Sequence, residues 1–308
     1  MIDYSSLGRP PRRRRGRAVI AAVAAVLVLG GLAVVALGHL GSGVAATKPS
    51  HHQETQPAPI HQAGKLTLGA CVDPTASIVS SFAVAIRRDL AQAVAGLAPA
   101  PGRLPTNTVS GGGPVTQPQA GVDLTVREVT TNSYSSVLGR YTTTVTVPPV
   151  PGLAYPRPSP SARDYLQRLR AWSAGYAAVA TARQAARKAA APGAAAIARM
   201  HLDRAGWSGI SACVSALLTT VPPGGRHSYL LASDLQQNVA PQLIGSFHGA
   251  PMVIIQTCDT GNVAFCQGLL RRFTRWMHQL HVGPITAVRP ELAATAIRQW
   301  IRTGEVTP

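Results

Sequence analysis

Asp73, Thr75 and Ser77 alternate along one short segment that directly follows the apolar residues 66–72. A carboxylate and two hydroxyls at positions i, i+2 and i+4, on the turn that leaves a buried strand, present hard oxygen atoms toward one point. Oxygen atoms of this kind are the ligands that divalent cations such as Ca²⁺ and Mg²⁺ take in proteins. The spacing therefore predicts a metal site at this turn.

Two polar residues far along the chain are predicted to join that turn. Asp234 follows the short apolar run 229–232, and Ser211 lies near the start of a helix expected over 208–220. Ligands of open α/β sheets bind beyond the carboxyl ends of the strands, and a serine at a helix N-cap places a hydroxyl at such a junction. For each aspartate alone, capping of a turn or helix is the alternative. The occurrence of both aspartates at strand ends favours a metal site over capping.

The elements that must position these residues alternate between helix and strand along residues 65–308. Apolar spacing predicts a helix over 78–97, and alternation predicts a hairpin of strands 122–130 and 141–147. Pro192-Gly193 is expected to divide two further helices. The remaining expected helices cover 161–191, 194–203, 208–220, 266–281 and 291–302, and the remaining strands cover 66–72, 229–232, 252–256 and 284–288. This order predicts an α/β domain with a doubly wound, mostly parallel sheet, one antiparallel edge hairpin and helices on both faces.

This arrangement resembles the von Willebrand factor A (integrin I-type) domain and its metal-ion-dependent adhesion site. The family has Asp-x-Ser/Thr-x-Ser after the first strand, a Thr opening a mid-domain helix and an Asp after the fourth strand. The resemblance covers residues 65–302, with an atypical helical insertion near 161–205, and Leu235 stands where a Gly often follows the last Asp. It implies Mg²⁺ or Mn²⁺ held by three hydroxyls and two carboxylates, with one position open for a ligand carboxylate. The implied ligands are Asp73, Thr75, Ser77, Ser211 and Asp234.

The first 64 residues are expected to anchor the domain. Residues 1–17 contribute +5 of the formal net charge of +17, and residues 18–40 contain twenty consecutive uncharged apolar positions, enough to cross a bilayer core of about 30 Å. The composition of residues 41–64, which is rich in Gly, Ser, Pro, Gln and His, predicts a flexible linker. The positive-inside rule places the basic tail in the cytoplasm and the domain outside the cell membrane, with a single pass. Cleavage of a signal peptide after Ala46 is the alternative.

Four cysteines, Cys71, Cys213, Cys258 and Cys266, follow the expected span. An even count suits disulfides in an oxidising compartment, and the CxxC pairs of a four-thiolate zinc site do not occur. Proximity favours a bridge between Cys258 and Cys266, which leaves Cys71 for Cys213. Three pairings are possible, and free buried thiols are a further alternative.

These features favour a binding module, not an enzyme, that captures a protein or other acidic ligand outside the membrane of a bacterial envelope. A phosphatase of the haloacid-dehalogenase type would need a second Asp where Thr75 stands, and no Gly-x-Ser-x-Gly, His-Glu-x-x-His or phosphate-loop motif occurs. The alternative is a metal-independent scaffold or polyanion binder that uses the basic surface. Specific nucleic-acid binding is not expected, because the arginines are not interleaved with aromatic residues.

Overall fold

The computed structural model describes most of the predicted domain. Its described residues are 64–74, 80–97, 118–130, 141–202, 208–220, 225–237, 244–258 and 262–307. The predicted basic tail, membrane span and linker lie outside these ranges, as do Thr75 and Ser77. Among the helices within these ranges, none has both the length and the apolar character needed to cross a membrane.

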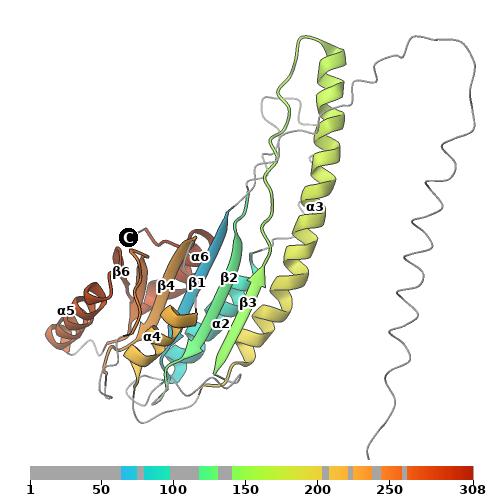
Figure 1. Cartoon of the computed structure of the whole chain (residues 1–308). Helices are drawn as coiled ribbons and strands as arrows, with labels where there is room; N and C mark the ends of the chain where they lie inside the picture. Colours follow the sequence, from blue (N-terminus) through green and yellow to red (C-terminus); the bar gives the residue numbers. More distant parts are fainter. Residues whose placement is uncertain are drawn as a thin grey trace, which may run out of the picture. The chain divides into compact units, whose positions relative to one another are not determined.

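A six-stranded sheet forms the centre of the domain (Figure 1). The β2–β3 pair is antiparallel and every other neighbouring pair is parallel. The first strand, β1, lies in the interior of the sheet. The next two strands, β2 and β3, lie on one side of it, and the last three, β4, β5 and β6, lie on the other side. This confirms the predicted mostly parallel sheet with an antiparallel edge hairpin. In spatial order the strands are β3 (Thr142–Val147), β2 (Gly121–Glu128), β1 (Lys65–Val72), β4 (Arg226–Ser233), β5 (Met252–Gln256) and β6 (Ile285–Val288).

Helices cover both faces of the sheet, as predicted. Side chains of β1 alternate between the two faces, so that Leu68 and Ala70 join one core and Cys71 joins the other. The first core contains residues of α2, α3 and α6, and the second contains residues of α4 and α5. Because both faces are buried, β1 reads as a nearly continuous apolar run. The helices are α2 (Ser80–Ala95), α3 (Ala162–Arg199), α4 (Ile210–Thr220), α5 (Val263–Gln279) and α6 (Ala293–Thr303), with a 3₁₀ turn η2 (Pro290–Leu292) before the last.

The helix α3 differs from the sequence expectation, because it runs without a break through Pro192. An internal proline costs about 3 kcal/mol in an exposed helix. Packing offsets this cost here: Ala190 and Ile197, on either side of the proline, are buried in the core. Gly193 lies so close to β3 that an added Cβ would overlap the Val145 side chain. The Pro-Gly pair therefore allows close helix–sheet contact and does not end the helix.

The two disulfides follow the pairing that proximity favoured. Cys71 at the end of β1 is bonded to Cys213 in α4, and Cys258 after β5 is bonded to Cys266 in α5. Both bridges attach a helix to the sheet on the same face. They also lie at the end of the sheet where the parallel strands finish.

Candidate metal centre at the carboxyl edge of the sheet

Asp73 and Asp234 lie at the ends of two neighbouring strands. The sheet register pairs Val72 of β1 with Ala232 of β4, and the Asp73 amide donates to the Ala232 carbonyl over 3.0 Å. Asp73 is completely buried and Asp234 is 4% exposed. We call this end of the sheet, where β1, β2 and β4 finish, the carboxyl edge. The order of the strands thus brings these two predicted residues to one edge.

Two serines that the sequence analysis did not single out hold the Asp73 carboxylate. The Ser233 hydroxyl donates to Asp73 Oδ2 over 2.7 Å, and the Ser208 hydroxyl lies 3.3 Å and 3.4 Å from the two carboxylate oxygens. The Leu235 amide in turn donates to Ser233 Oγ over 2.9 Å. Because Ser233 reads as the last residue of an apolar strand and Ser208 precedes a helix, only the fold reveals that both hydroxyls meet Asp73.

Ser211 lies in the first turn of α4, which begins at Ile210, and not at the N-cap position expected for it. Gln237 contacts it twice: the Ser211 amide donates to Gln237 Oε1 over 2.9 Å, and Gln237 Nε2 donates to Ser211 Oγ over 2.8 Å. This pair of hydrogen bonds ties the segment after β4 to the start of α4. The hydroxyl seen beside Asp73 near this junction is that of Ser208.

The backbone after β4 turns sharply at Leu235. Asp234 Oδ1 accepts a hydrogen bond from the Gln236 amide over 2.9 Å, the turn-stabilising contact that short polar side chains make. Leu235 has φ of 64°, a left-handed conformation that glycine adopts without strain and leucine rarely adopts. This left-handed conformation explains why a Gly would suit position 235, directly after Asp234.

Charge is concentrated at this edge. Among the described residues, the buried charged side chains are Asp73, Asp234, Glu128 and Arg127, which is 6% exposed. Glu128 pairs with Val72 in the sheet and Arg127 pairs with Cys71, so all four lie at strand ends of the carboxyl edge. Burial lowers the pKa of Arg127 from its ordinary value. Three of these four buried groups are carboxylates, so the buried charged groups at this edge are mainly acidic.

The ligand set at this edge is made of oxygen atoms from carboxylates and hydroxyls. Within the part of the chain that the structure describes, no group of three or more His, Cys, Asp or Glu residues is placed to hold a metal ion. A site here therefore needs the hydroxyls of Ser208 or Ser211, together with Thr75 and Ser77 on the turn outside the described residues. Such a hard, oxygen-only set suits Mg²⁺ or Mn²⁺ and does not suit zinc.

Comparison with solved structures gives a weak likeness. No family model and no curated protein matches the chain. Among solved structures it is similar to a von Willebrand factor type A protein from Catenulispora acidiphila, with 10% identity and a TM-score of 0.37. The likeness covers 78% of this chain and 42% of that one, so the chain spans less than half the length of the structure it matches.

Proposed function

We propose that this chain is a membrane-anchored binding module that captures a protein or other acidic ligand outside the membrane through a divalent cation at the carboxyl edge. The observation that supports the proposal most is the gathering of buried acidic side chains and hydroxyls at that edge. Asp73, Asp234 and Glu128 are buried there, and the hydroxyls of Ser208 and Ser233 contact the Asp73 carboxylate. Burying charge is costly unless the charge is paired, hydrogen-bonded or bound to a metal. A divalent cation at this edge would bring positive charge next to oxygen atoms of the kind it prefers.

The residues of the edge are suited to different parts of this task. Asp73 and Asp234 supply negative charge, and Ser208 supplies a neutral hydroxyl oxygen beside Asp73, with Ser211 in the first turn of α4 as a further hydroxyl. Thr75 and Ser77 would complete the set from the turn after β1. Few carboxylates around a small hard ion leave it able to attract a carboxylate of the ligand. This chemistry selects an acidic partner.

A covalent link holds the two sides of the site together. Cys71 lies two residues before Asp73, and Cys213 lies two residues after Ser211, so their disulfide joins the strand end to the helix start. The Ser233 hydroxyl orients the Asp73 carboxylate from β4. These contacts position the oxygens before any ligand arrives, which lowers the conformational entropy lost on binding.

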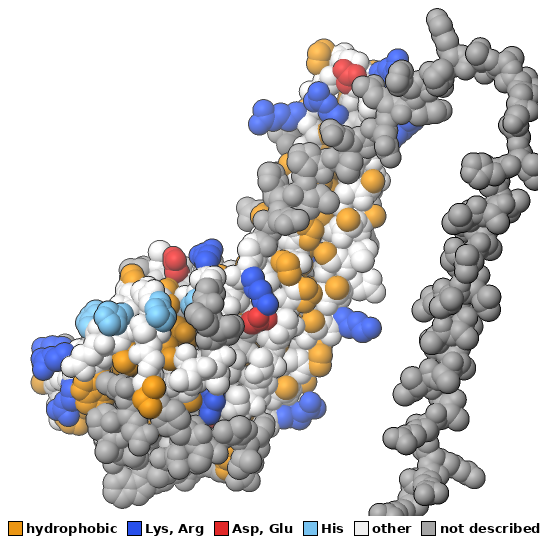
Figure 2. Space-filling view, viewed as in Figure 1, with side chains coloured by type: hydrophobic (Ala, Val, Ile, Leu, Met, Phe, Trp, Pro, Cys, Tyr) orange, Lys and Arg blue, Asp and Glu red, His pale blue; other side chains and the backbone are white. Residues whose placement is uncertain are grey.

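The metal-independent alternative requires a continuous basic surface. In Figure 2 the Lys and Arg side chains are scattered over the visible face and do not gather in one patch. The arginines of α3 are spread along its whole length, at Arg163, Arg168, Arg170, Arg183, Arg187 and Arg199. A scattered arrangement supports weak, salt-sensitive attraction to polyanions.

The test of the proposed function is calorimetric titration of Mg²⁺ and Mn²⁺ into the full chain in detergent. We expect saturable binding to the wild-type protein and at least tenfold weaker binding to Asp234→Asn. The matched control is Asp164→Asn, which removes one negative charge from the exposed first turn of α3 and should leave the titration unchanged. Absence of saturable binding in the wild type, or equal affinities in wild type and Asp234→Asn, would contradict the proposal.

Membrane anchoring is tested separately by deleting residues 18–40. The shortened chain should leave the membrane fraction, whereas the full chain should remain there after washing with high salt. A full chain that washes off with salt would replace the anchor with a purely electrostatic attachment.

A further inference from the structure

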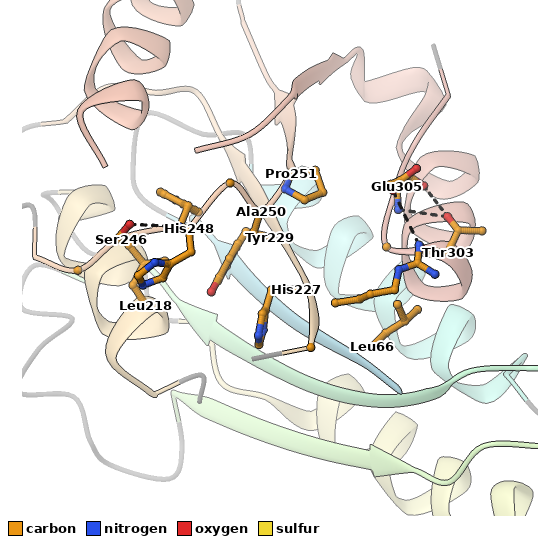
Figure 3. Close-up of a pocket in the computed structure, with 16 residues that line it drawn as sticks. Leu66, Leu218, His227, Tyr229, Ser246, His248, Ala250, Pro251, Thr303 and Glu305 are labelled. Atoms are coloured by element: carbon orange, nitrogen blue, oxygen red, sulfur yellow. Dashed lines mark hydrogen bonds and ion pairs between the residues drawn. The ribbon is translucent and has the colours of Figure 1, made fainter. Parts of the chain in front are cut away.

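The opposite edge of the sheet, where β1 and β4 begin, contains a cavity of about 720 Å³ (Figure 3). We call this end the amino edge. In Figure 3, Ser246 and His248 lie on one side of the cavity and Thr303 and Glu305 on the other, with His227 and Tyr229 between them. The volume falls within the range of about 300–1,000 Å³ that small-molecule sites occupy. It is large enough for a small organic molecule and lies far along the strands from Asp73.

One wall of the cavity is apolar and aromatic. Tyr229 and Phe247 pack edge to face with ring centroids 4.9 Å apart. Gly69 of β1 makes room for the Tyr229 ring, since a Cβ at that position would lie 2.9 Å from Tyr229 Cδ1. Burial raises the pKa of Tyr229 to about 12, so its phenol stays protonated and is able to donate a hydrogen bond. This wall suits the aromatic or aliphatic body of a ligand.

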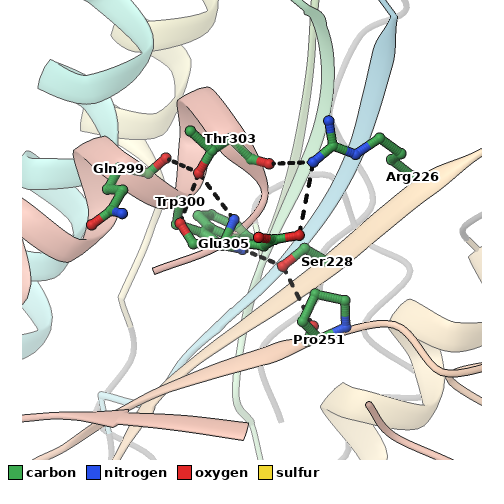
Figure 4. A network of polar contacts seen from close by, with 7 residues as sticks. All are labelled: Arg226, Ser228, Pro251, Gln299, Trp300, Thr303 and Glu305. Carbon is green, nitrogen blue, oxygen red and sulfur yellow. Dashed lines mark hydrogen bonds and ion pairs between the residues drawn. The ribbon is translucent and has the colours of Figure 1, made fainter. Parts of the chain in front are cut away.

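The opposite rim is held in place by a network of polar contacts (Figure 4). Trp300 Nε1 donates to Ser228 Oγ over 2.8 Å, which fixes α6 against β4. The Arg226 guanidinium donates to the Thr303 carbonyl over 3.1 Å and lies 3.8 Å from the Glu305 carboxylate. The Thr303 hydroxyl lies 2.8 Å from the Glu305 carbonyl. The segment after α6 is therefore tied to the first residues of β4.

His227 carries unused hydrogen-bonding capacity beside this cavity. Both of its ring nitrogens are buried, and neither has a hydrogen-bond partner among the residues that the structure describes. An imidazole always has at least one N–H donor, and a buried donor without a partner is destabilising. A ligand acceptor in the cavity would supply that partner.

The polar groups of the cavity favour an anion. Arg226, His227 and His248 line it, and Glu305 is the one acidic residue among its described lining residues. Glu305 lies against Arg226, so the described lining contributes no further carboxylate that would repel an anion. The Ser246 hydroxyl accepts from the His248 amide over 3.1 Å and so fixes the loop that carries the second imidazole.

From these observations we infer that the amino-edge cavity binds a small organic carboxylate. Its carboxylate accepts a hydrogen bond from His227, and its apolar body packs on Tyr229 and Phe247. This site is independent of the carboxyl edge and needs no metal ion. A neutral molecule of the same shape would lack the negative charge that Arg226 attracts.

The test compares benzoate with benzamide, its uncharged counterpart of equal size, by calorimetric titration of the full chain in the presence of EDTA. We expect benzoate to bind saturably and benzamide to bind at least tenfold more weakly. Equal affinity for the two probes, or no saturable benzoate binding up to about 10 mM, would overturn the inference. Benzoate binding that EDTA abolishes would assign the interaction to the carboxyl edge and would also overturn it.

Variants locate the binding site. His227→Phe keeps a ring but removes both nitrogens, and should weaken benzoate binding at least tenfold. His227→Gln retains a donor and should recover part of the loss. The matched control is His278→Phe on the exposed face of α5, outside the cavity lining, which should leave benzoate binding unchanged. Unchanged binding in both His227 variants would place the carboxylate elsewhere.

Discussion

The two edges of the central sheet differ in how their charged side chains are held. At the carboxyl edge the charged groups are buried: three carboxylates and one guanidinium, none more than 6% exposed. At the amino edge the charged pair is exposed, since the side chains of Arg226 and Glu305 are 66% and 69% accessible. Parallel pairing makes this separation possible, because the ends of β1, β2, β4, β5 and β6 meet at one edge and their starts at the other. One sheet therefore displays two distinct chemistries.

Among the changes that separate the two edges, Asp73→Asn is expected to have the largest effect. It keeps the size and the acceptor oxygen that Ser233 contacts, but removes one buried negative charge. We expect Mg²⁺ affinity to fall at least about a hundredfold, or about 2.7 kcal/mol, and any rise of melting temperature with Mg²⁺ to disappear. In EDTA the variant should be at least as stable as the wild type, because less like charge is buried.

The control for this change lies at the other edge. Glu305→Gln also removes one carboxylate charge, but from an exposed position. It should leave both the Mg²⁺ titration and the stability in EDTA close to those of the wild type. If the two variants behaved alike, net charge and not the buried edge would govern cation binding.

Trp300→Phe is expected to affect the amino edge alone. Trp300 is completely buried, and its indole N–H donates to Ser228. Loss of the hydrogen bond and of part of the ring volume should lower the free energy of unfolding by about 1–3 kcal/mol, measured by urea denaturation. Mg²⁺ affinity should stay unchanged, and a parallel loss of Mg²⁺ binding would show that the two edges are coupled.

A smaller effect is expected from Tyr229 in alkaline solution. Burial raises its pKa to about 12, whereas an exposed tyrosine ionises near pH 10. Between about pH 10 and about pH 12 the unfolded chain releases the phenolic proton and the folded chain retains it, so stability must fall as pH rises through this range. The urea midpoint of the wild type should therefore decline more steeply there than that of Tyr229→Phe. Identical slopes would contradict the raised pKa.

The sequence was sufficient for the fold class, because its signals agreed at several levels. The apolar run of β1, the alternation in β2 and β3, and the helical spacing of α2 each pointed to the element that the structure contains. The break expected at Pro192 was wrong because a local rule was overridden by tertiary packing against Val145. Local propensity alone carries no information about such contacts.

The site was predictable only in part. Asp73 and Asp234 were placed at one edge by the logic of parallel strands, which needs no side-chain detail. The contact of Ser208 with Asp73, and the burial of Arg127 and Glu128, depend on neighbours that are remote in the chain. No local sequence pattern indicates the amino-edge cavity, because its lining comes from β1, α4, β4, the loop before β5 and the end of α6 with the segment that follows it.

The bond between Cys71 and Cys213 also sets an order of events during synthesis. Its two cysteines are separated by 142 residues, so at about 5–20 residues per second the first thiol waits roughly 7–30 s for its partner. Cys258 and Cys266, only 8 residues apart, wait less than about 2 s. Throughout the longer interval Cys71 is the sole cysteine of the nascent chain and is available to oxidants and to other chains. Correct assembly of the domain therefore depends on keeping this one thiol reduced until α4 has been made.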